Sequence, residues 1–460
     1  MKKFSTLILL LSLVFFTGAY NLFATTPNIE EKTISTPFLK DPALYFEFMR
    51  VISKTPEHGA DIGESIYTAK QVTIVNPAAP SSDITTTLTS WHDQWKQLAE
   101  RIEKIGDDCL SKNNKISARD AYLRATEYYR TAEFFLHNPE NTNESEINYL
   151  SKKWLTCFNK AIKLYNFEIE RVKIPYQGTT LPGYYIRANQ KSNPGPTLIV
   201  QNGFDGTAEE LVVQYGFDAA RRGYNFLAFE GPGQGQVIRE QKLYFRPDWE
   251  TVVTPVINYI LTKKEVDSKR IALYGLSMGG YFAPRAAAYD HRIAACIANS
   301  GIYDVFVTNT AGSNLSKEQI VDLLLNQPKM INSLALAGMK NNIQQYWGYN
   351  HGMWAFGVKT PSELLLKELD YNLINCVDKI ICPVLVIDIE KDQSFGSEAQ
   401  KLYDQLNCPK TLIVFKKNEG ADLNYQIGAQ LLSNQRIFDW LEVTLPKKTL
   451  PKIKKKNRRK

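Results

Sequence analysis

The chain has 460 residues, of which 44% are hydrophobic and 22% are charged, and this composition is that of an ordinary globular protein with two or three structural units. Its formal net charge is +7, but residues 447–460 alone contain nine Lys and Arg, so the rest of the chain carries −2 (7 − 9). A near-neutral body excludes a basic nucleic-acid groove, and we expect no nucleic-acid contact through it.

The N-terminal segment has the pattern of a signal peptide. Lys2 and Lys3 precede the apolar run Leu7 to Phe16, the small residues Thr17-Gly18-Ala19 follow, and Ala24 is a second possible cleavage end. This run is too short for a comfortable membrane span. We therefore predict a signal peptide over residues 1–24 and an exported protein, periplasmic or secreted, with an uncleaved anchor as the alternative.

Residues 447–460 are predicted to form a disordered basic tail, because their like charges repel one another. Such a tail can contact an anionic membrane or polymer. The six cysteines of the chain are scattered and lack the C-x-x-C or Cys/His spacing of a metal site, so the sequence predicts no bound metal.

Helical periodicity dominates the first part of the chain, where we expect a helical domain over residues 25–166. Apolar residues of the stretch Trp91 to Ile105 recur at spacings of three and four on one face. Ser117 is expected to cap a second helix that continues to Leu136, where Asn138-Pro139 stops it. The aromatic residues of this helix belong either to the core or to a substrate wall: Tyr122, Tyr128, Tyr129, Phe134 and Phe135.

From Phe167 onward the pattern changes to strands. Glu168 to Ile174 and Thr180 to Ala188 alternate in hydrophobicity, which predicts an antiparallel hairpin. Strands and helices then alternate, the pattern of a parallel, doubly wound sheet with helices on both faces, and a last helix is expected over Gln426 to Leu441. A mostly helical interruption over about residues 301–377 is interpreted as a lid at the carboxyl edge of the sheet.

One stretch carries a chemical signature, Arg270 to Tyr281 (RIALYGLSMGGY). It contains G-x-S-x-G, centred on Ser277, directly after a predicted strand and before a predicted helix. The turn is so tight that only glycine fits two residues to either side of the serine, whose Oγ then projects above the carboxyl ends of the strands. A glycine-rich turn that merely opens a helix is the alternative reading of the same residues.

Six motifs together carry a resemblance: ISARDAYLRATEYYRTAEFFL, NGFDGTAEEL, EGPGQGQ, GLSMGGY, CPVLVIDIEKD and NQRIFDWLE. The chain resembles the α/β-hydrolase superfamily, in the branch that contains 2,6-dihydroxypseudooxynicotine hydrolase and the fermentation–respiration-switch type esterases. This implies an α/β-hydrolase core over residues 167–446, with a mostly parallel eight-stranded sheet, a helical N-terminal domain over the active site and a helical lid after strand 6. It also implies a homodimer and a small-molecule substrate, cleaved without a cofactor at an ester or at a carbon–carbon bond next to a carbonyl.

The resemblance assigns Ser277 as the nucleophile and Asp392, at the end of a strand, as the acid of a Ser–Asp–His triad. Asp388 and Glu390 are weaker candidates for the acid, because strand geometry rather than a loop directs their side chains. The oxyanion donors would be the backbone N–H of Met278 and, from the preceding loop, that of Phe204.

The triad histidine should follow the last strand, in a loop that reads EGA, two residues, then His in the family. In this chain the loop begins at Glu419, and the matching position is Asn424. No histidine occurs after His351. Asparagine cannot accept and return a proton near neutral pH, so the general base of the triad is missing.

Three interpretations follow from the missing base. The protein is an inactive or very weak hydrolase kept for binding, or a hydrolase whose base has moved, or a catalyst that needs only an oxyanion hole and a carboxylate. His351 in the lid is the best candidate for a moved base, and His291 is a weaker one. Either histidine can equally be an ordinary core or surface residue.

Overall fold

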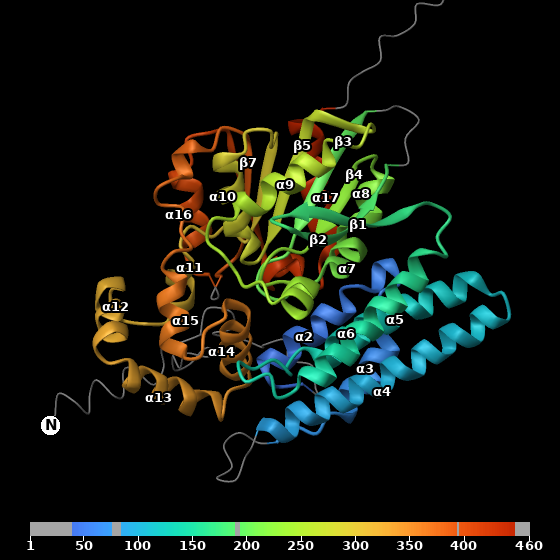
Figure 1. The fold of residues 1–460 in the computed structure, drawn as a ribbon, viewed down its shortest axis with the longest axis horizontal. Helices are drawn as coiled ribbons and strands as arrows, with labels where there is room; N and C mark the ends of the chain where they lie inside the picture. The colour runs from blue at the N-terminus through green and yellow to red at the C-terminus, as the bar shows by residue number, and fades with distance from the viewer. Residues whose placement is uncertain (1–38, 76–83, 189–193, 393–394, 447–460) are drawn as a thin grey trace, which may run out of the picture.

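The computed structural model describes residues 39–75, 84–188, 194–392 and 395–446 (Figure 1). The predicted signal peptide and the predicted basic tail both lie outside the described residues. Within the described ranges, no helix is both long enough and apolar enough to cross a membrane.

An eight-stranded sheet forms the centre of the molecule, in the order β1-β2-β4-β3-β5-β6-β7-β8. The strands are β1 (Ile169–Tyr176), β2 (Thr179–Ile186), β3 (Gly195–Gln201), β4 (Asn225–Phe229), β5 (Val266–Leu276), β6 (Ala295–Asn299), β7 (Val384–Ile389) and β8 (Lys410–Phe415). β2 pairs antiparallel with both β1 and β4, and the remaining neighbours are parallel. The predicted hairpin and the mostly parallel sheet are therefore confirmed.

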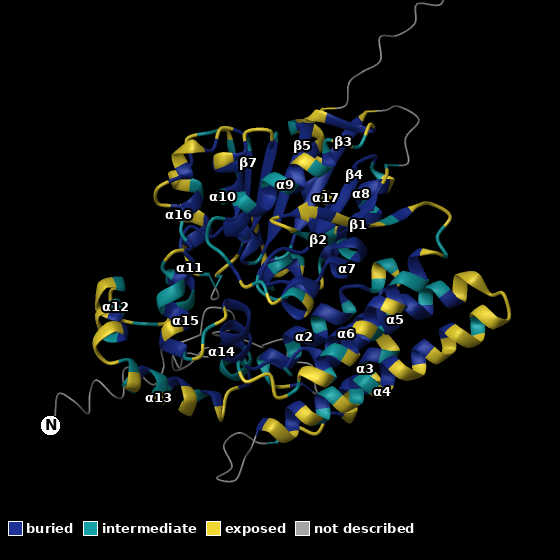
Figure 2. Cartoon of the chain, in the orientation of Figure 1, coloured by how far each residue is buried: buried dark blue, intermediate teal, exposed yellow. Residues whose placement is uncertain are grey.

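Helices cover both faces of this sheet, so β3, β4 and β6 are buried along their whole length (Figure 2). Alternate residues of β3 face opposite sides: Leu198 and Val200 belong to one hydrophobic cluster and Ile199 to the other. The first cluster includes α7 (Ala208–Leu211), a π-helical turn, α8 (Phe217–Arg221) and α17 (Gln430–Thr444), and the second includes α9 (Glu250–Ile260), α10 (Gly279–Tyr289) and α16 (Glu398–Gln405).

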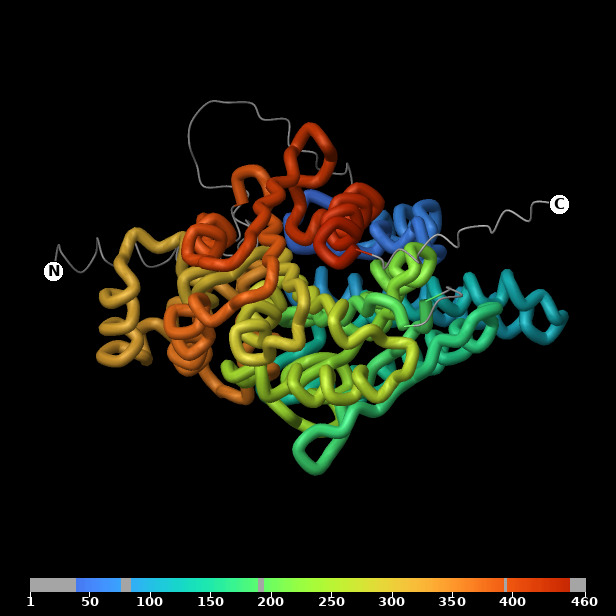
Figure 3. Tube along the Cα trace, turned by 90° about the horizontal axis from the view of Figure 1, so that it is seen from above, coloured from blue at the N-terminus to red at the C-terminus, as the bar shows by residue number. Residues whose placement is uncertain are grey.

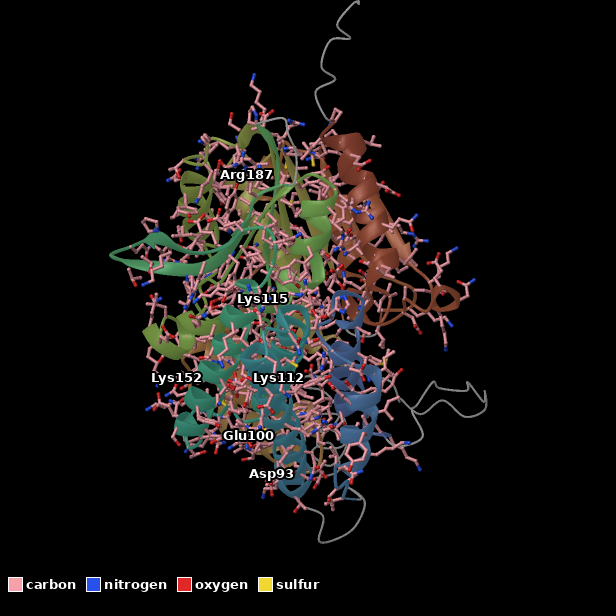
Figure 4. All side chains as sticks on the ribbon, turned by 90° about the vertical axis from the view of Figure 1, so that its right-hand side faces the viewer. Asp93, Glu100, Lys112, Lys115, Lys152 and Arg187 are labelled. Atoms are coloured by element: carbon pink, nitrogen blue, oxygen red, sulfur yellow. The ribbon has the colours of Figure 1, made fainter. Side chains whose placement is uncertain are left out.

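Among the described residues, five α-helices precede the sheet: α2 (Pro42–Ile52), α3 (Ile62–Gln71), α4 (Ile84–Ser111), α5 (Lys115–Glu133) and α6 (Glu144–Ile162). Trp91 and Trp95 of α4 are fully buried, whereas Asp93 and Glu100 lie on its exposed face (Figure 4). α5 begins two residues before Ser117, after Asn114, so the expected cap at Ser117 is wrong and this serine lies inside the helix.

The predicted lid is confirmed as a set of helices between β6 and β7: α11 (Val305–Thr310), α12 (Lys317–Asn326), α13 (Pro328–Met339), α14 (Ile343–Phe356) and α15 (Pro361–Glu368). α12 lies at one end of the molecule, and the connection between α4 and α5 lies at the opposite end (Figures 1 and 3). Between them α14 reaches α2, and the ring of Trp347 stacks on Phe134 at a centroid distance of 5.0 Å. Lid and N-terminal helices therefore meet beside the sheet.

Candidate active site

Ser277 occupies the turn between β5 and α10. Its backbone has φ 59°, a left-handed conformation that a non-glycine residue adopts only under constraint. Its N–H donates to the Asn299 carbonyl at 2.6 Å. A Cβ atom at Gly275 would lie 1.9 Å from the Gly279 carbonyl oxygen, so only glycine permits this turn. The segment thus has the strand–turn–helix form that its sequence predicts.

Asp392 follows β7 and faces Asn424, which lies in a short turn (Asn424–Gln426) after β8. The Asn424 amide Nδ2 is 3.3 Å from Asp392 Oδ1 and 3.4 Å from Oδ2. Phe395 also donates its N–H to Asp392 Oδ1, at 3.0 Å. Asn424 therefore donates to Asp392 as an imidazole N–H would, but an amide cannot act as a base.

The two weaker candidates for the acid have other surroundings. Asp388 accepts the N–H of Ile389 at 2.8 Å, and burial, together with the charge of Asp392, raises the pKa of Asp388 to about 6. Glu390 accepts the N–H of Lys417 at 3.2 Å. The geometry favours Asp392 over both of them as the acid that faces Asn424.

Ser277 opens on a cavity that contains about 1140 Å³ of empty space, part of it open to solvent. We call it the Ser277 cavity, and seven aromatic rings line it: Phe46, Phe134, Phe135, Phe204, Trp347, Phe395 and Tyr425. Two of the five aromatic residues that were candidates for a substrate wall, Phe134 and Phe135, thus reach this cavity. The other three are buried away from it, and their hydroxyl groups donate to carboxylates: Tyr122 to Asp107, Tyr128 to Glu64 and Tyr129 to Glu103.

All five histidines of the chain lie in the described ranges, and none of them lines the Ser277 cavity. The Nε2 atom of His351 is 3.0 Å from the Phe204 carbonyl oxygen, behind the loop that borders the cavity. Burial, reinforced by the neighbouring His137, lowers the pKa of His351 to about 3. His291 is exposed, with Nε2 3.2 Å from the Lys379 carbonyl oxygen. Neither candidate for a moved base lies where a base is needed.

The two expected oxyanion donors border the same cavity. A Cβ atom at Gly203 would lie 2.4 Å from the Met278 nitrogen, so the loop of residues 202–206 runs directly against the serine turn. Within the part of the chain that the structure describes, no acceptor takes the N–H of Met278 or of Phe204. Both N–H groups can therefore bind an oxygen atom of a ligand placed at Ser277.

Tyr425 is a site residue that sequence reasoning missed. Its φ of 59°, followed by 53° at Gln426, turns the chain back, so α17 begins at Gln430 and not at Gln426 as expected. Its ring lies edge-on to Phe46. Burial raises the pKa of the Tyr425 phenol, and a hydrogen bond with Ser277 lowers it by a smaller amount. The phenol therefore stays protonated at neutral pH and lies next to the nucleophile.

A buried charge network, also missed, borders the cavity on the side of α2. Arg50 donates to both carboxylate oxygens of Glu210 at 2.8 Å and to Asp205 at 2.5 Å. Glu210 belongs to the capping box that starts α7, and Asp205 directly follows Phe204. The remaining members of the network are Glu47, Lys54, Glu127 and Arg130. The only sequence signal was a lone Arg–Glu pair in the apolar helix PALYFEFMRVI.

No group of three or more His, Cys, Asp or Glu in the described ranges is arranged to hold a metal ion. All six cysteines are free thiols, four of them buried. Ser277, the backbone of Met278 and Phe204 and the aromatic rings thus border one cavity, and the pair of Asp392 and Asn424 follows β7 and β8 outside its lining.

Comparison with known proteins identifies the family of the chain. The family model for FrsA-like esterases matches residues 89–370. Hydrolyase poxO of Penicillium oxalicum is 30% identical over 430 residues, which cover 88% of this chain and 98% of poxO. Hydrolase acrC of Aspergillus aculeatus is 32% identical over 435 residues, which cover 88% of this chain and 97% of acrC.

Solved structures agree on the fold. The crystal structure of 2,6-dihydroxy-pseudo-oxynicotine hydrolase superposes with a TM-score of 0.64 at 18% identity and covers 87% of this chain and 97% of its own. At that identity the likeness concerns the fold alone. Together with the fungal hydrolases it confirms the predicted α/β-hydrolase branch. The chain belongs to the FrsA-like esterase family of α/β hydrolases.

Proposed function

We propose that this protein binds a small carbonyl compound at Ser277 and hydrolyses it slowly at most. The observation that carries the proposal is Asn424, which lies against Asp392 at 3.3 Å and which the resemblance matches to the triad histidine. The same view is supported by the absence of all five histidines from the lining of the Ser277 cavity.

The chemical reason for slow hydrolysis is the transfer of one proton. Attack by Ser277 requires a group that takes the Oγ proton and then returns it to the leaving group. An amide cannot do this, and in a subtilisin-type triad the loss of the histidine costs on the order of 10⁶ in rate, which leaves roughly 10³ over water. The residual rate comes from ligand binding and the oxyanion donors, both of which this site retains.

The lining of the cavity supports a class of ligand. Aromatic rings suit an apolar, flat molecule, and the N–H groups of Met278 and Phe204 suit its carbonyl oxygen. The bond to be cleaved is then an ester bond or a carbon–carbon bond next to that carbonyl, and no cofactor is needed. The alternative is a binding protein with no turnover at all.

Two measurements test the proposal. An alkyl fluorophosphonate should label Ser277 slowly, and labelling should disappear in Ser277→Ala but persist in the matched control Ser333→Ala, which alters an exposed serine of α13. Hydrolysis of p-nitrophenyl butyrate should be far below the roughly 1–10³ s⁻¹ that is ordinary for enzymes. Turnover in that range, lost in Ser277→Ala, would overturn the proposal, and turnover that survives Ser277→Ala would remove Ser277 from it.

A further inference from the structure

The motif EGPGQGQ has no role in the site described so far, although it lies beside it. Its first glutamine, Gln234, follows β4 and is 1% exposed. A buried glutamine is costly unless each of its polar groups has a partner. The hydrogen-bond partners of Gln234 therefore indicate its role.

Gln234 binds the loop that carries the expected oxyanion donor. Its Nε2 donates to the Asn202 carbonyl at 2.7 Å and to the Gly203 carbonyl at 2.8 Å. Its Oε1 accepts the N–H of Gly231 at 2.9 Å, which fixes the amide in this orientation. Only a side chain that donates twice and accepts once can make this set of contacts, and an amide is such a group.

These contacts determine where the next N–H points. In a planar trans peptide the carbonyl of one residue and the N–H of the following residue point in opposite directions. Because Gln234 holds the Gly203 carbonyl on its own side, the N–H of Phe204 points away from Gln234. Gly203 and Phe204 both line the Ser277 cavity, and no acceptor in the described ranges takes this N–H.

We propose that Gln234 is a positioning residue that holds the peptide between Gly203 and Phe204 so that the Phe204 N–H faces a carbonyl bound at Ser277. The proposal rests on the proposed function, because it assigns Gln234 to the same carbonyl site. His351, from the lid, holds the next carbonyl in the loop, that of Phe204, at 3.0 Å. Gln234 and His351, from different parts of the chain, thus both hold carbonyl groups of this loop.

Labelling kinetics with an alkyl fluorophosphonate separate this role from a merely structural one. Gln234→Leu removes both donors, and we expect its maximal labelling rate, kinact, to fall about 10²-fold, as when one oxyanion donor is lost. The reversible binding constant KI reports only occupation of the cavity and should not change. The matched control Gln430→Leu alters another buried glutamine, which donates to Asn434 on α17, and should leave both constants unchanged.

Gln234→Glu keeps the shape of the side chain and adds a pH signature. A neutral carboxyl group can donate one hydrogen bond to a loop carbonyl, and a carboxylate can donate none. The ratio of variant to wild-type kinact should therefore fall as the pH rises through the pKa of the new carboxyl group. Crystal structures of the two leucine variants give a readout that does not depend on labelling: the peptide between Gly203 and Phe204 should rotate in Gln234→Leu only.

Two results would overturn the proposal. One is a folded Gln234→Leu protein with unchanged kinact and an unrotated peptide, and the other is an equal loss of kinact in Gln430→Leu. Failure of the proposed function is recognised separately, by rapid ester turnover in the wild type, because the ratio of labelling rates between variants does not depend on how fast the wild type turns over.

Discussion

At the scale of single residues, the proposed function depends on Asn424. We expect Asn424→His to raise hydrolysis of p-nitrophenyl butyrate, by the 10²–10⁴-fold that a general base typically contributes. Asp392 is already in place to accept the imidazole N–H, since it accepts the Asn424 amide now. The rate should rise with pH through roughly 6–7, as the new imidazole loses its proton.

The control for this experiment is the double variant Asn424→His, Ser277→Ala, in which the gain should vanish. A gain that persists in the double variant would show that the new histidine acts on water or on another group. No gain at all, with an imidazole seen between Asp392 and Ser277 in a crystal structure, would show that the missing base is not what limits this site.

His351 leads to a different prediction at this scale, because its protonation should change the free energy of unfolding and not the chemistry at Ser277. Its pKa is about 3 in the folded protein and 6.5 when unfolded, so the unfolded chain binds more protons between these values. The stabilisation by neutral His351 is therefore complete above pH 6.5 and is lost as the pH falls toward 3, by at most about 1.4 kcal/mol per pH unit.

His351→Gln should remove this dependence and keep a donor for the Phe204 carbonyl. Urea denaturation at pH 7 and pH 5 should then show a smaller loss of unfolding free energy in His351→Gln than in the wild type. His291→Gln, which alters an exposed histidine, is the matched control. If His351→Gln instead abolished an ester hydrolysis present in the wild type, His351 would be the moved base after all.

At the scale of elements, Arg50 joins α2 to the loop beside Ser277. We expect Arg50→Met to lower the free energy of unfolding by about 3–5 kcal/mol, because it removes the cation that joins the half-buried Asp205 to the buried Glu210 and leaves Glu210 with only Lys54 and Arg130. Urea denaturation followed by tryptophan fluorescence measures this loss. Arg221→Met is the matched control: Arg221 pairs with Glu57 at the surface and should cost at most about 1 kcal/mol. Equal effects of the two substitutions would contradict a stabilising role for the network.

The elements also show what can be predicted from sequence and what cannot. The turn at Ser277 follows from glycine spacing, and the lid between β6 and β7 follows from a helical interruption of the alternating strands and helices, which are local patterns. The facing of Asn424 toward Asp392 was implied by the family resemblance. Arg50 and Asp205 are 155 positions apart, and no local pattern reveals that they meet. The position of Tyr425 depends on its φ of 59°, which could not be predicted from the sequence around it.

At the scale of the whole molecule, the charge is concentrated in residues 447–460, outside the described part of the chain. We propose that this segment binds anionic surfaces and adds nothing to the stability of the folded body, whose formal charge is −2. Each cation held near an anionic membrane contributes about 1 kcal/mol, and salt screens this attraction over roughly 10 Å at 0.1 M. The nine cations of the segment therefore suffice for binding at low salt.

Deletion of residues 447–460 should abolish sedimentation with phosphatidylserine vesicles and leave the Tm unchanged, because the tail is predicted to make no packed contacts. The full chain should sediment with these vesicles at 0.05 M salt and lose most of that binding at 0.5 M salt. It should not sediment with phosphatidylcholine vesicles. A substitution of the same nine residues by Ser and Gln separates charge from length and should behave like the deletion. A Tm lowered by several degrees in either variant would mean that the tail packs on the folded body, and salt-independent binding would mean that apolar contact, not charge, holds the protein to the membrane.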